Sequence, residues 1–387
     1  MATTQTEFDV LQTELESGGV AAVLGRLIEQ LCAKKRFHEM FEALKMQVRL
    51  EIGLPVQYDD SGDELDEATR LNLEEGLVNA CREVGTLMMK DGAIREAWMY
   101  LRPVGDRAAV AAVLAEIESN EENLDEMVEV CLHEGVDPAR GFRLVLDHYG
   151  TCNAITTFEA TLQQRNPQEQ QRVAGMLVEH LHGELLASVK ADIAQNEGAE
   201  PAALTLRELV ADRDWLFGEH RYHLDTTHLA STVRFARLLE DSDHLRLALD
   251  MTEYGRRLSD QFQYEGDEPF TDIYPSHGLF FQALLGENLE DALDFFRQKA
   301  ETIDAYEFGR SAIEVYIELL ARLDRFDDAL NASIQFSSPD AQPIGHAPGI
   351  LELSDKAGTY DRLLEHCRDQ DDLLGFATGL IRAHATA

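Results

Sequence analysis

The sequence predicts an all-α protein folded as a right-handed α-α superhelix, a solenoid of stacked antiparallel helix hairpins. Apolar residues recur at helical spacing through nearly the whole chain of 387 residues, as they do where one face of each helix is buried. Runs of alternating β-branched residues are absent, so a fold built on a parallel sheet is not expected. In the C-terminal half, pairs of helices recur at intervals of roughly 34 to 45 residues, which is typical of helical-repeat solenoids.

The N-terminal half is predicted to be a succession of helices. Several have a polar or acidic start, and most are ended by Gly or Pro. The expected helices are one to about Cys32, a second from about Arg36 to the stop at Gly53 and Pro55, and others at 67–90, after Gly92 through Met99, at 119–135 and at 137–150.

The best candidate for a domain break is the segment NEGAEPAALT, residues 196–205, which follows a long helix ending near Ala194. It combines Gly, Pro and small residues. We therefore expect an N-terminal helical-hairpin region at 1–195 and a C-terminal helical-repeat region at 196–387, with one continuous solenoid as the alternative. Beyond the break, one helix is expected to end near Phe217 or Gly218.

Four segments of the C-terminal half share one pattern, in which a bulky residue is followed by a second residue three positions later and a third four positions after that. These positions lie on one face of a helix, and a small middle residue lets a neighbouring helix approach closely. The triplets are Leu245/Ala248/Thr252, Leu289/Ala292/Phe296, Phe326/Ala329/Ser333 and Tyr360/Leu363/Cys367.

Each triplet follows another predicted helix, and the pairs resemble the tetratricopeptide-repeat family, with the triplet in the second helix of the repeat. The resemblance is clearest over residues 226–370 and weaker over 18–134, where KRFHEMFEAL and GAIREAWMYL are similar. The first-helix Trp/Leu-Gly/Tyr signature of that family is mostly missing. The resemblance implies a non-enzymatic scaffold that binds a protein or peptide partner on an extended surface.

The charge of the chain favours some partners over others. With 72 acidic and 34 basic side chains, its formal net charge is −38. Such a surface repels phosphate backbones and anionic lipid headgroups, so neither nucleic acid nor a membrane is expected as a partner. Basic proteins, peptides or metal cations are compatible with it, and so is a role in solubility alone. No secretory signal or long apolar span is visible, and the five cysteines are scattered, so a cytoplasmic protein is expected.

The stretch GEHRYHLDTTHL, residues 218–229, concentrates three histidines and an aspartate. Asp225 is expected to cap a helix, which places His220 and His223 in the preceding loop and His228 in the first turn. A His–Asp pair can perform general acid–base chemistry near neutral pH. His223, Asp225 and His228 are therefore the candidate catalytic residues.

A metal site is the other chemical interpretation of these histidines. His180 and Glu184 lie one turn apart and are expected on the inner face of their helix, and His277 lies at the start of another helix. Imidazole and carboxylate ligands suit zinc, iron or manganese. The candidate ligands are His180, Glu184, His220, His223, His228 and His277. The alternative is that these imidazoles only tie loops to helices, and then no cofactor is expected.

A further candidate binding group comprises Tyr254, Arg256 and Arg257, whose arginines could grip a carboxylate or phosphate or pair with nearby acids. Nucleotide-binding, hydrolase-elbow and kinase motifs are absent. The leading hypothesis is the helical-repeat scaffold for a protein or peptide partner. The alternative is an all-α metal-binding protein or enzyme that uses a His/Asp/Glu pocket. A self-assembling structural protein is a third possibility.

Overall fold

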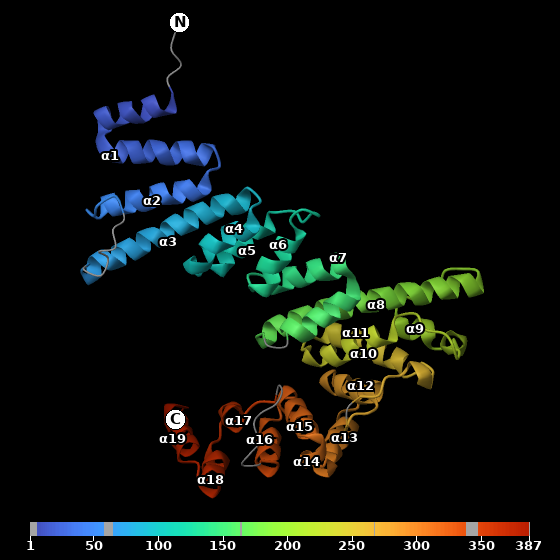
Figure 1. Ribbon diagram of the computed structural model, residues 1–387. Helices are drawn as coiled ribbons and strands as arrows, with labels where there is room; N and C mark the ends of the chain where they lie inside the picture. The colour runs from blue at the N-terminus through green and yellow to red at the C-terminus, as the bar shows by residue number, and fades with distance from the viewer. Residues whose placement is uncertain (1–5, 58–64, 163–164, 267, 338–346, 387) are drawn as a thin grey trace. The chain divides into compact units, whose positions relative to one another are not determined.

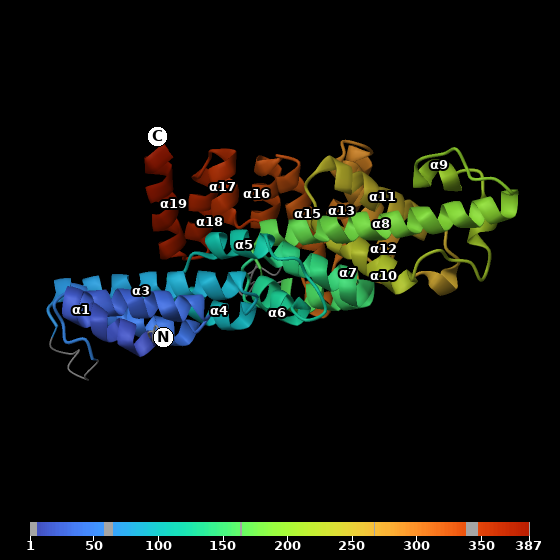
Figure 2. The ribbon, with the colours of Figure 1, turned by 90° about the horizontal axis from the view of Figure 1, so that it is seen from above.

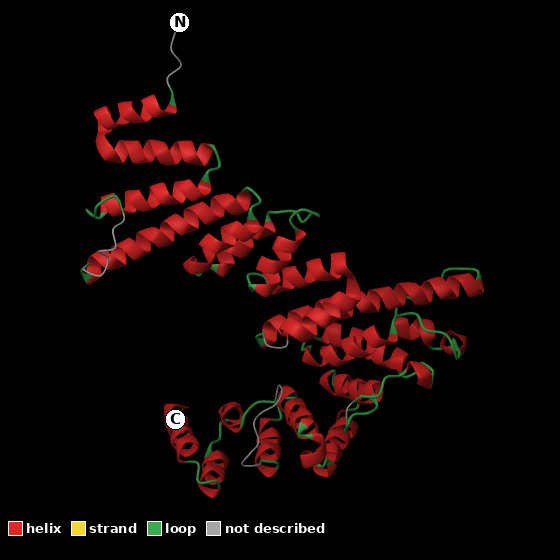
Figure 3. Ribbon diagram, in the orientation of Figure 1, coloured by secondary structure: helices red, strands yellow, loops and turns green. Residues whose placement is uncertain are grey.

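The computed structural model describes residues 6–57, 65–162, 165–266, 268–337 and 347–386 (Figure 1). These residues form helices and loops without a β-strand, as Figure 3 shows, apart from a single bridge between Glu265 and Asp272. The all-α prediction is confirmed. Within the described residues, every helix is too short or too polar to span a membrane.

The chain divides into two compact units, residues 1–157 and 158–387. The division differs from the predicted boundary between residues 195 and 196. That position lies at the end of α8 (Pro167–Glu197), which packs against α9, α10 and α11 later in the chain. Because these contacts cross the loop at 198–205, the loop joins two parts of unit 2.

Unit 1 contains seven α-helices in its described part, most of which contact the next helix in the chain. They are α1 (Glu7–Ala33), α2 (Phe37–Glu51), α3 (Glu67–Lys90), α4 (Ile94–Leu101), α5 (Arg107–Ala115), α6 (Leu124–Val128) and α7 (Pro138–Thr157). The predicted helices are confirmed in number and approximate position up to Met99. The two shorter predicted helices correspond to α6 with a π-helical turn after it, and to α7, which Gly150 kinks rather than ends.

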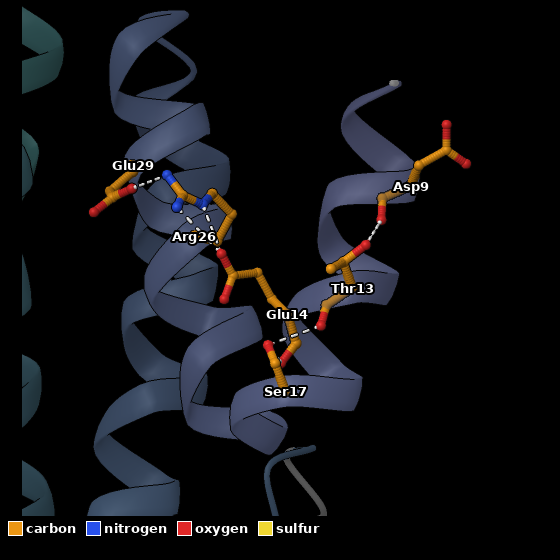
Figure 4. Close-up of polar contacts among 6 residues, drawn as sticks. All are labelled: Asp9, Thr13, Glu14, Ser17, Arg26 and Glu29. Carbon is orange, nitrogen blue, oxygen red and sulfur yellow. Dashed lines mark hydrogen bonds and ion pairs between the residues drawn. The ribbon is translucent and has the colours of Figure 1, made fainter. Parts of the chain in front are cut away.

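Helix α1 folds back on itself at Gly19, whose backbone has φ 72° and ψ −165°. Glycine suits this position because a residue with a Cβ is strained at positive φ. Figure 4 shows Arg26 beyond the kink, reaching back to Glu14 before it at 3.1 Å and also holding Glu29 at 2.7 Å. On the first half, the hydroxyls of Ser17 and Thr13 donate to backbone carbonyls one turn earlier. An exposed ion pair contributes little to stability, so the kink depends mainly on the glycine.

Unit 2 begins with a π-helical turn at Phe158–Leu162 and then α8, followed by eleven further α-helices in its described part. These are α9 (Leu206–Val210), α10 (Thr226–Phe235), α11 (Ser242–Gly255), α12 (Ile273–Leu284), α13 (Leu289–Thr302), α14 (Ala305–Phe308), α15 (Ser311–Arg322), α16 (Phe326–Gln335), α17 (Ile350–Ala357), α18 (Asp361–Asp369) and α19 (Leu373–Thr386). The prediction of a helix that ends near Phe217 is wrong in part. The helix stops at Val210, and a 3₁₀ turn at Asp214–Phe217 follows.

The helices of unit 2 from α10 onward pack mainly on their neighbours in the chain. α11 packs on α12, α13 on α15, α15 on α16, α16 on α17 and α18 on α19. Figure 2 shows α15 to α19 as a row of helices standing side by side. Tyr360, Leu363 and Cys367 form a buried cluster of their own at the end of this row, against α17 and α19.

The four triplets contribute buried side chains to these helix contacts. Their middle residues are almost fully buried, with Ala248, Ala292 and Ala329 at 0% exposure and Leu363 at 5%. The triplets lie in α11, α13, α16 and α18, with Tyr360 at the N-cap of α18. The predicted inner face of these helices is therefore confirmed.

Candidate functional site

The histidine-rich stretch joins α9 and its 3₁₀ turn to α10. Asp225 is the N-cap of α10, and its carboxylate accepts hydrogen bonds from the backbone amides of Thr227 at 2.9 Å and His228 at 3.2 Å. Hydrogen bonds from the Thr227 hydroxyl and these amides lower the pKa of Asp225. The predicted cap, the loop position of His223 and the first-turn position of His228 are confirmed. The Asp225 carboxylate therefore acts as the helix cap.

His223 is the centre of a hydrogen-bonded chain that connects three elements. Its Nε2 lies 3.1 Å from the Asp192 carboxylate on α8, and its Nδ1 lies 2.8 Å from the hydroxyl of Tyr254 on α11. With Nε2–H donating to Asp192, Nδ1 accepts from the Tyr254 hydroxyl. The backbone amide of His223 donates to the same hydroxyl at 2.9 Å. We call Asp192, His223 and Tyr254 the α8–α11 polar junction.

This junction is built inside the protein. Only 6% of the His223 side chain is exposed, and Tyr254 is 1% exposed. Burial raises the pKa of Tyr254 well above its usual range. A phenol held neutral in this way keeps its proton and acts as a hydrogen-bond donor to the imidazole. The arrangement fixes the loop to both helices.

The other candidate catalytic and metal-ligating residues of the stretch are directed elsewhere. The contact between His228 and Asp225 is the backbone cap bond. His220 is exposed, and its Nδ1 lies 3.5 Å from the side-chain nitrogen of Gln261. The candidate catalytic group His223, Asp225 and His228 is therefore divided between a buried junction and a helix cap.

On α8, the buried histidine is His182 rather than His180. The Nε2 of His180 lies 3.3 Å from Glu184, whose side chain is 47% exposed, so this pair lies toward solvent and not on the inner face. His182 is 8% exposed, and its Nε2 lies 3.6 Å from Asp250 on α11. The prediction failed because α8 is buried over a wide arc rather than a single stripe.

His277 lies within α12 and is partly buried. Its Nδ1 donates to the carbonyl of Ile273 at 2.8 Å. Burial, with a smaller contribution from the positive charge of Arg237, lowers the pKa of His277 to about 4. The imidazole is therefore neutral at physiological pH. It borders a void of only about 10 Å³, which is close to the minimum volume for a single water.

The positions of these histidines and carboxylates test the predicted metal site. Across the described ranges of the chain, no group of three or more His, Cys, Asp or Glu side chains is arranged to hold a metal ion. His180 and Glu184 pair only with each other among the candidate ligands, on α8, whereas the bonds described above for His220, His223, His228 and His277 go to residues outside the ligand set. The structure does not bring them into one coordination sphere.

The candidate binding group is also divided. Arg257 stacks on Phe217 at 4.1 Å, donates to the Val210 carbonyl and pairs with Asp214 at 2.7 Å. It therefore fastens the 3₁₀ turn to the end of α11, and Tyr254 belongs to the α8–α11 polar junction. Arg256 alone is exposed, and it lines a cavity of about 290 Å³ between α11, α12 and α13.

A groove of about 510 Å³ in unit 2 was not predicted from the sequence. Its lining comes from the first turns of α8, the residues after α10, the end of α12, α15 with its following turn, and the start of α16 and α17. We call it the α8–α17 groove; its described lining residues are Pro167, Gln171, Leu238, Glu240, Leu284, Glu318, Ala321, Arg322, Asp324, Phe326, Pro348, Glu352 and Lys356. Its volume lies within the range of about 300 to 1,000 Å³ that ligand sites occupy.

A buried ion-pair cluster forms the floor of this groove. Glu318 on α15 is 4% exposed and pairs with Arg237, and its other oxygen lies 3.5 Å from Arg322 one turn later. Both guanidinium groups lie over the ring of Phe280, at 5.6 and 5.5 Å from its centroid. Arg322 also donates to two carbonyls of the segment after α10. The cluster therefore fixes the α10 end against α15.

The charge of the groove is acidic. Its described lining contains four carboxylates, Glu240, Glu318, Asp324 and Glu352, against two cations, Arg322 and Lys356. Glu318 is held between Arg237 and Arg322, and Lys356 pairs with Glu352 at 3.6 Å, so Glu240 and Asp324 supply the excess negative charge of the exposed lining. Gln171 and Glu240 both line the groove, and Gln171 donates to one oxygen of this carboxylate at 2.8 Å.

Comparisons with known proteins found no relative of this chain. The chain matches no protein-family model, no curated protein and no solved structure.

Proposed function

We propose that unit 2 is a tetratricopeptide-like array of helix hairpins that binds a basic segment of a protein partner in the α8–α17 groove. The order of packing supports the array, because the helices from α10 to α19 mainly contact their neighbours in the chain. The buried alanines at 248, 292 and 329 support it further, because they allow the close helix approach that such repeats need.

The observation that carries the binding proposal is the acidic lining of the groove. The exposed carboxylates of Glu240, Asp324 and Glu352 outnumber the exposed cation Lys356. Lysine or arginine side chains of a peptide would complete the hydrogen bonds of these carboxylates, and the net charge of −38 would speed their approach. Leu284 and Phe326 in the lining give apolar side chains of the peptide a surface to pack on.

A labelled peptide tests this proposal directly. A fluorescein-labelled peptide of alternating lysine and leucine is titrated with the full chain, and binding is followed by fluorescence anisotropy. The variant E240Q/E352Q removes two groove carboxylates that lie at the surface. The matched control E116Q/E118Q removes two exposed carboxylates of unit 1, so both variants change the net charge equally.

We expect E240Q/E352Q to weaken binding about tenfold, which corresponds to about 1.4 kcal/mol, and E116Q/E118Q to change it less than about twofold. An equal loss in both variants would mean that the peptide responds only to overall charge. Absence of binding by the unmodified chain would also contradict the proposal.

A further inference from the structure

The helix α19 exposes a continuous apolar surface. Leu373 is 80% exposed, Leu374 79%, Leu380 47% and Ile381 70%. The opposite side of the helix packs on α17 and α18 through Phe376 and its neighbours. A helix that is apolar on nearly all sides is normally buried on all of them. The exposed side of α19 therefore fits a partner surface.

We propose that this surface binds the same helix of a second copy of the chain, in an antiparallel pair related by a twofold axis near Ala377. The spacing of the apolar residues is symmetric about that position. Leu373 and Ile381 are each four residues from Ala377, and Leu374 and Leu380 are each three residues from it. In an antiparallel pair, each leucine therefore meets an apolar residue of the partner, and the small alanine lets the helices approach closely.

Charge favours a second copy at this helix. Two chains of net charge −38 repel each other over most of their surfaces. Helix α19 contains no acidic residue, whereas its last turns carry Arg382 and His384. The acidic residues Asp371 and Asp372 precede its first turn. An antiparallel pair therefore brings the acidic end of one helix near the basic end of the other.

The other large exposed apolar side chains near a helix end are less suited to self-association. On α1, Phe8 is 79% exposed and Leu15 is 54% exposed. They lie among four carboxylates of the same half-helix, Glu7, Asp9, Glu14 and Glu16. A second copy bound there would place these charges close to one another, which disfavours the contact.

The area that the proposed dimer would bury indicates how tightly the two copies should associate. Covering the four exposed side chains would remove roughly 500 Å² per copy and about 1,000 Å² for the pair, which is the lower limit for a specific interface. We therefore expect a dimer that dissociates in the micromolar range. This inference does not depend on the peptide groove, because α19 contributes none of the described residues that line it.

Sedimentation equilibrium of the full chain tests the dimer at concentrations from about 1 to about 200 μM. The variant Ile381→Glu places two like charges in the proposed seam, and we expect it to raise the dissociation constant at least tenfold. The matched control is Met99→Glu on α4, since Met99 is 71% exposed and Ile381 is 70% exposed. We expect this control to leave the dissociation constant unchanged.

Cysteine crosslinking tests the position of the axis. Ala377→Cys should form an intermolecular disulfide under mild oxidation, because residues on a twofold axis face their own copies. Ala385→Cys, which is exposed on the same helix but lies off the axis, should not. Both are made with Cys152→Ala, because Cys152 is exposed. A chain that stays monomeric, an association unaffected by Ile381→Glu, or equal crosslinking at both sites would overturn the proposal.

Discussion

Replacing Tyr254 by phenylalanine removes a single oxygen atom from the α8–α11 polar junction. That hydroxyl accepts from the backbone amide of His223 at 2.9 Å and bonds its Nδ1 at 2.8 Å. Two hydrogen bonds are lost, and the amide is left without its acceptor in a largely buried site. Because a typical hydrogen bond contributes about 1 kcal/mol and an unsatisfied buried group costs about 1 to 3 kcal/mol, we expect the free energy of unfolding to fall by about 2 kcal/mol.

Tryptophan fluorescence can follow this change in unit 2 alone. The chain has two tryptophans, Trp98 in unit 1 and Trp215 in the 3₁₀ turn of unit 2. With Trp98→Phe as the common background, urea unfolding reported by Trp215 measures the unit that contains the junction. The control is Tyr222→Phe, which removes the hydroxyl of a tyrosine that is 53% exposed in the same loop.

We expect Tyr222→Phe to change the free energy of unfolding by less than about 0.5 kcal/mol, as is usual for surface substitutions. A double-mutant cycle that combines Tyr254→Phe with His223→Ala should give a coupling energy of about 1 kcal/mol, since the two residues share a hydrogen bond. If Tyr254→Phe cost no more than Tyr222→Phe, the junction would not fasten the loop and the reasoning would be refuted.

Three further predictions follow from other buried contacts. Glu318→Ala should lower the free energy of unfolding by about 3 kcal/mol in the same urea assay, because two partly buried arginines lose their counter-charge. Burial alone would lower the pKa of His244, but hydrogen bonds to Asp241 and Glu179 raise it above its usual value. The protonated imidazole therefore stabilises the fold below the unfolded pKa of about 6.5, and this contribution is lost as pH rises through the folded pKa. The free energy of unfolding, measured between about pH 5.5 and 8.5, should therefore depend less on pH in His244→Gln than in the unmodified chain. Ala292→Leu should cost about 2 kcal/mol by overpacking against the adjacent helix, and an unchanged urea midpoint would contradict the close helix approach.

Local chemistry explains why most helices could be predicted. Gly53 ends the second helix region, Asp225 caps α10, and the triplet residues repeat at helical spacing, so each signal lies within a few residues of the boundary or face that it determines. The prediction of one helix up to Phe217 failed where the chain breaks at Arg213, with φ −125° and ψ 65°. Arg257, which follows α11 and lies about forty residues later in the chain, stacks on Phe217 and pairs with Asp214, and no local pattern reports these contacts with the 3₁₀ turn.

The candidate site was less predictable because its residues are brought together by packing. Sequence analysis singled out His223 and Tyr254, but as members of different groups, since they lie 31 residues apart. It missed Asp192, which is one of many acidic residues on helix surfaces. The α8–α17 groove combines segments from Pro167 to Lys356, so it exists only once these distant segments pack together.

The acid–base chemistry predicted for the histidines needs an imidazole beside a cavity that can hold a substrate, and in the described residues the two are separate. The cavities of about 510, 290 and 220 Å³ have no histidine among their described lining residues. His223 has hydrogen-bond partners at both ring nitrogens, and His277 borders a void too small for a substrate. The hydrogen bonds of the histidines account for how loops and helices are joined, whereas the groove offers carboxylates to a cationic ligand. The binding role proposed for unit 2 uses these carboxylates, whereas the acid–base role predicted for the histidines would not involve the groove.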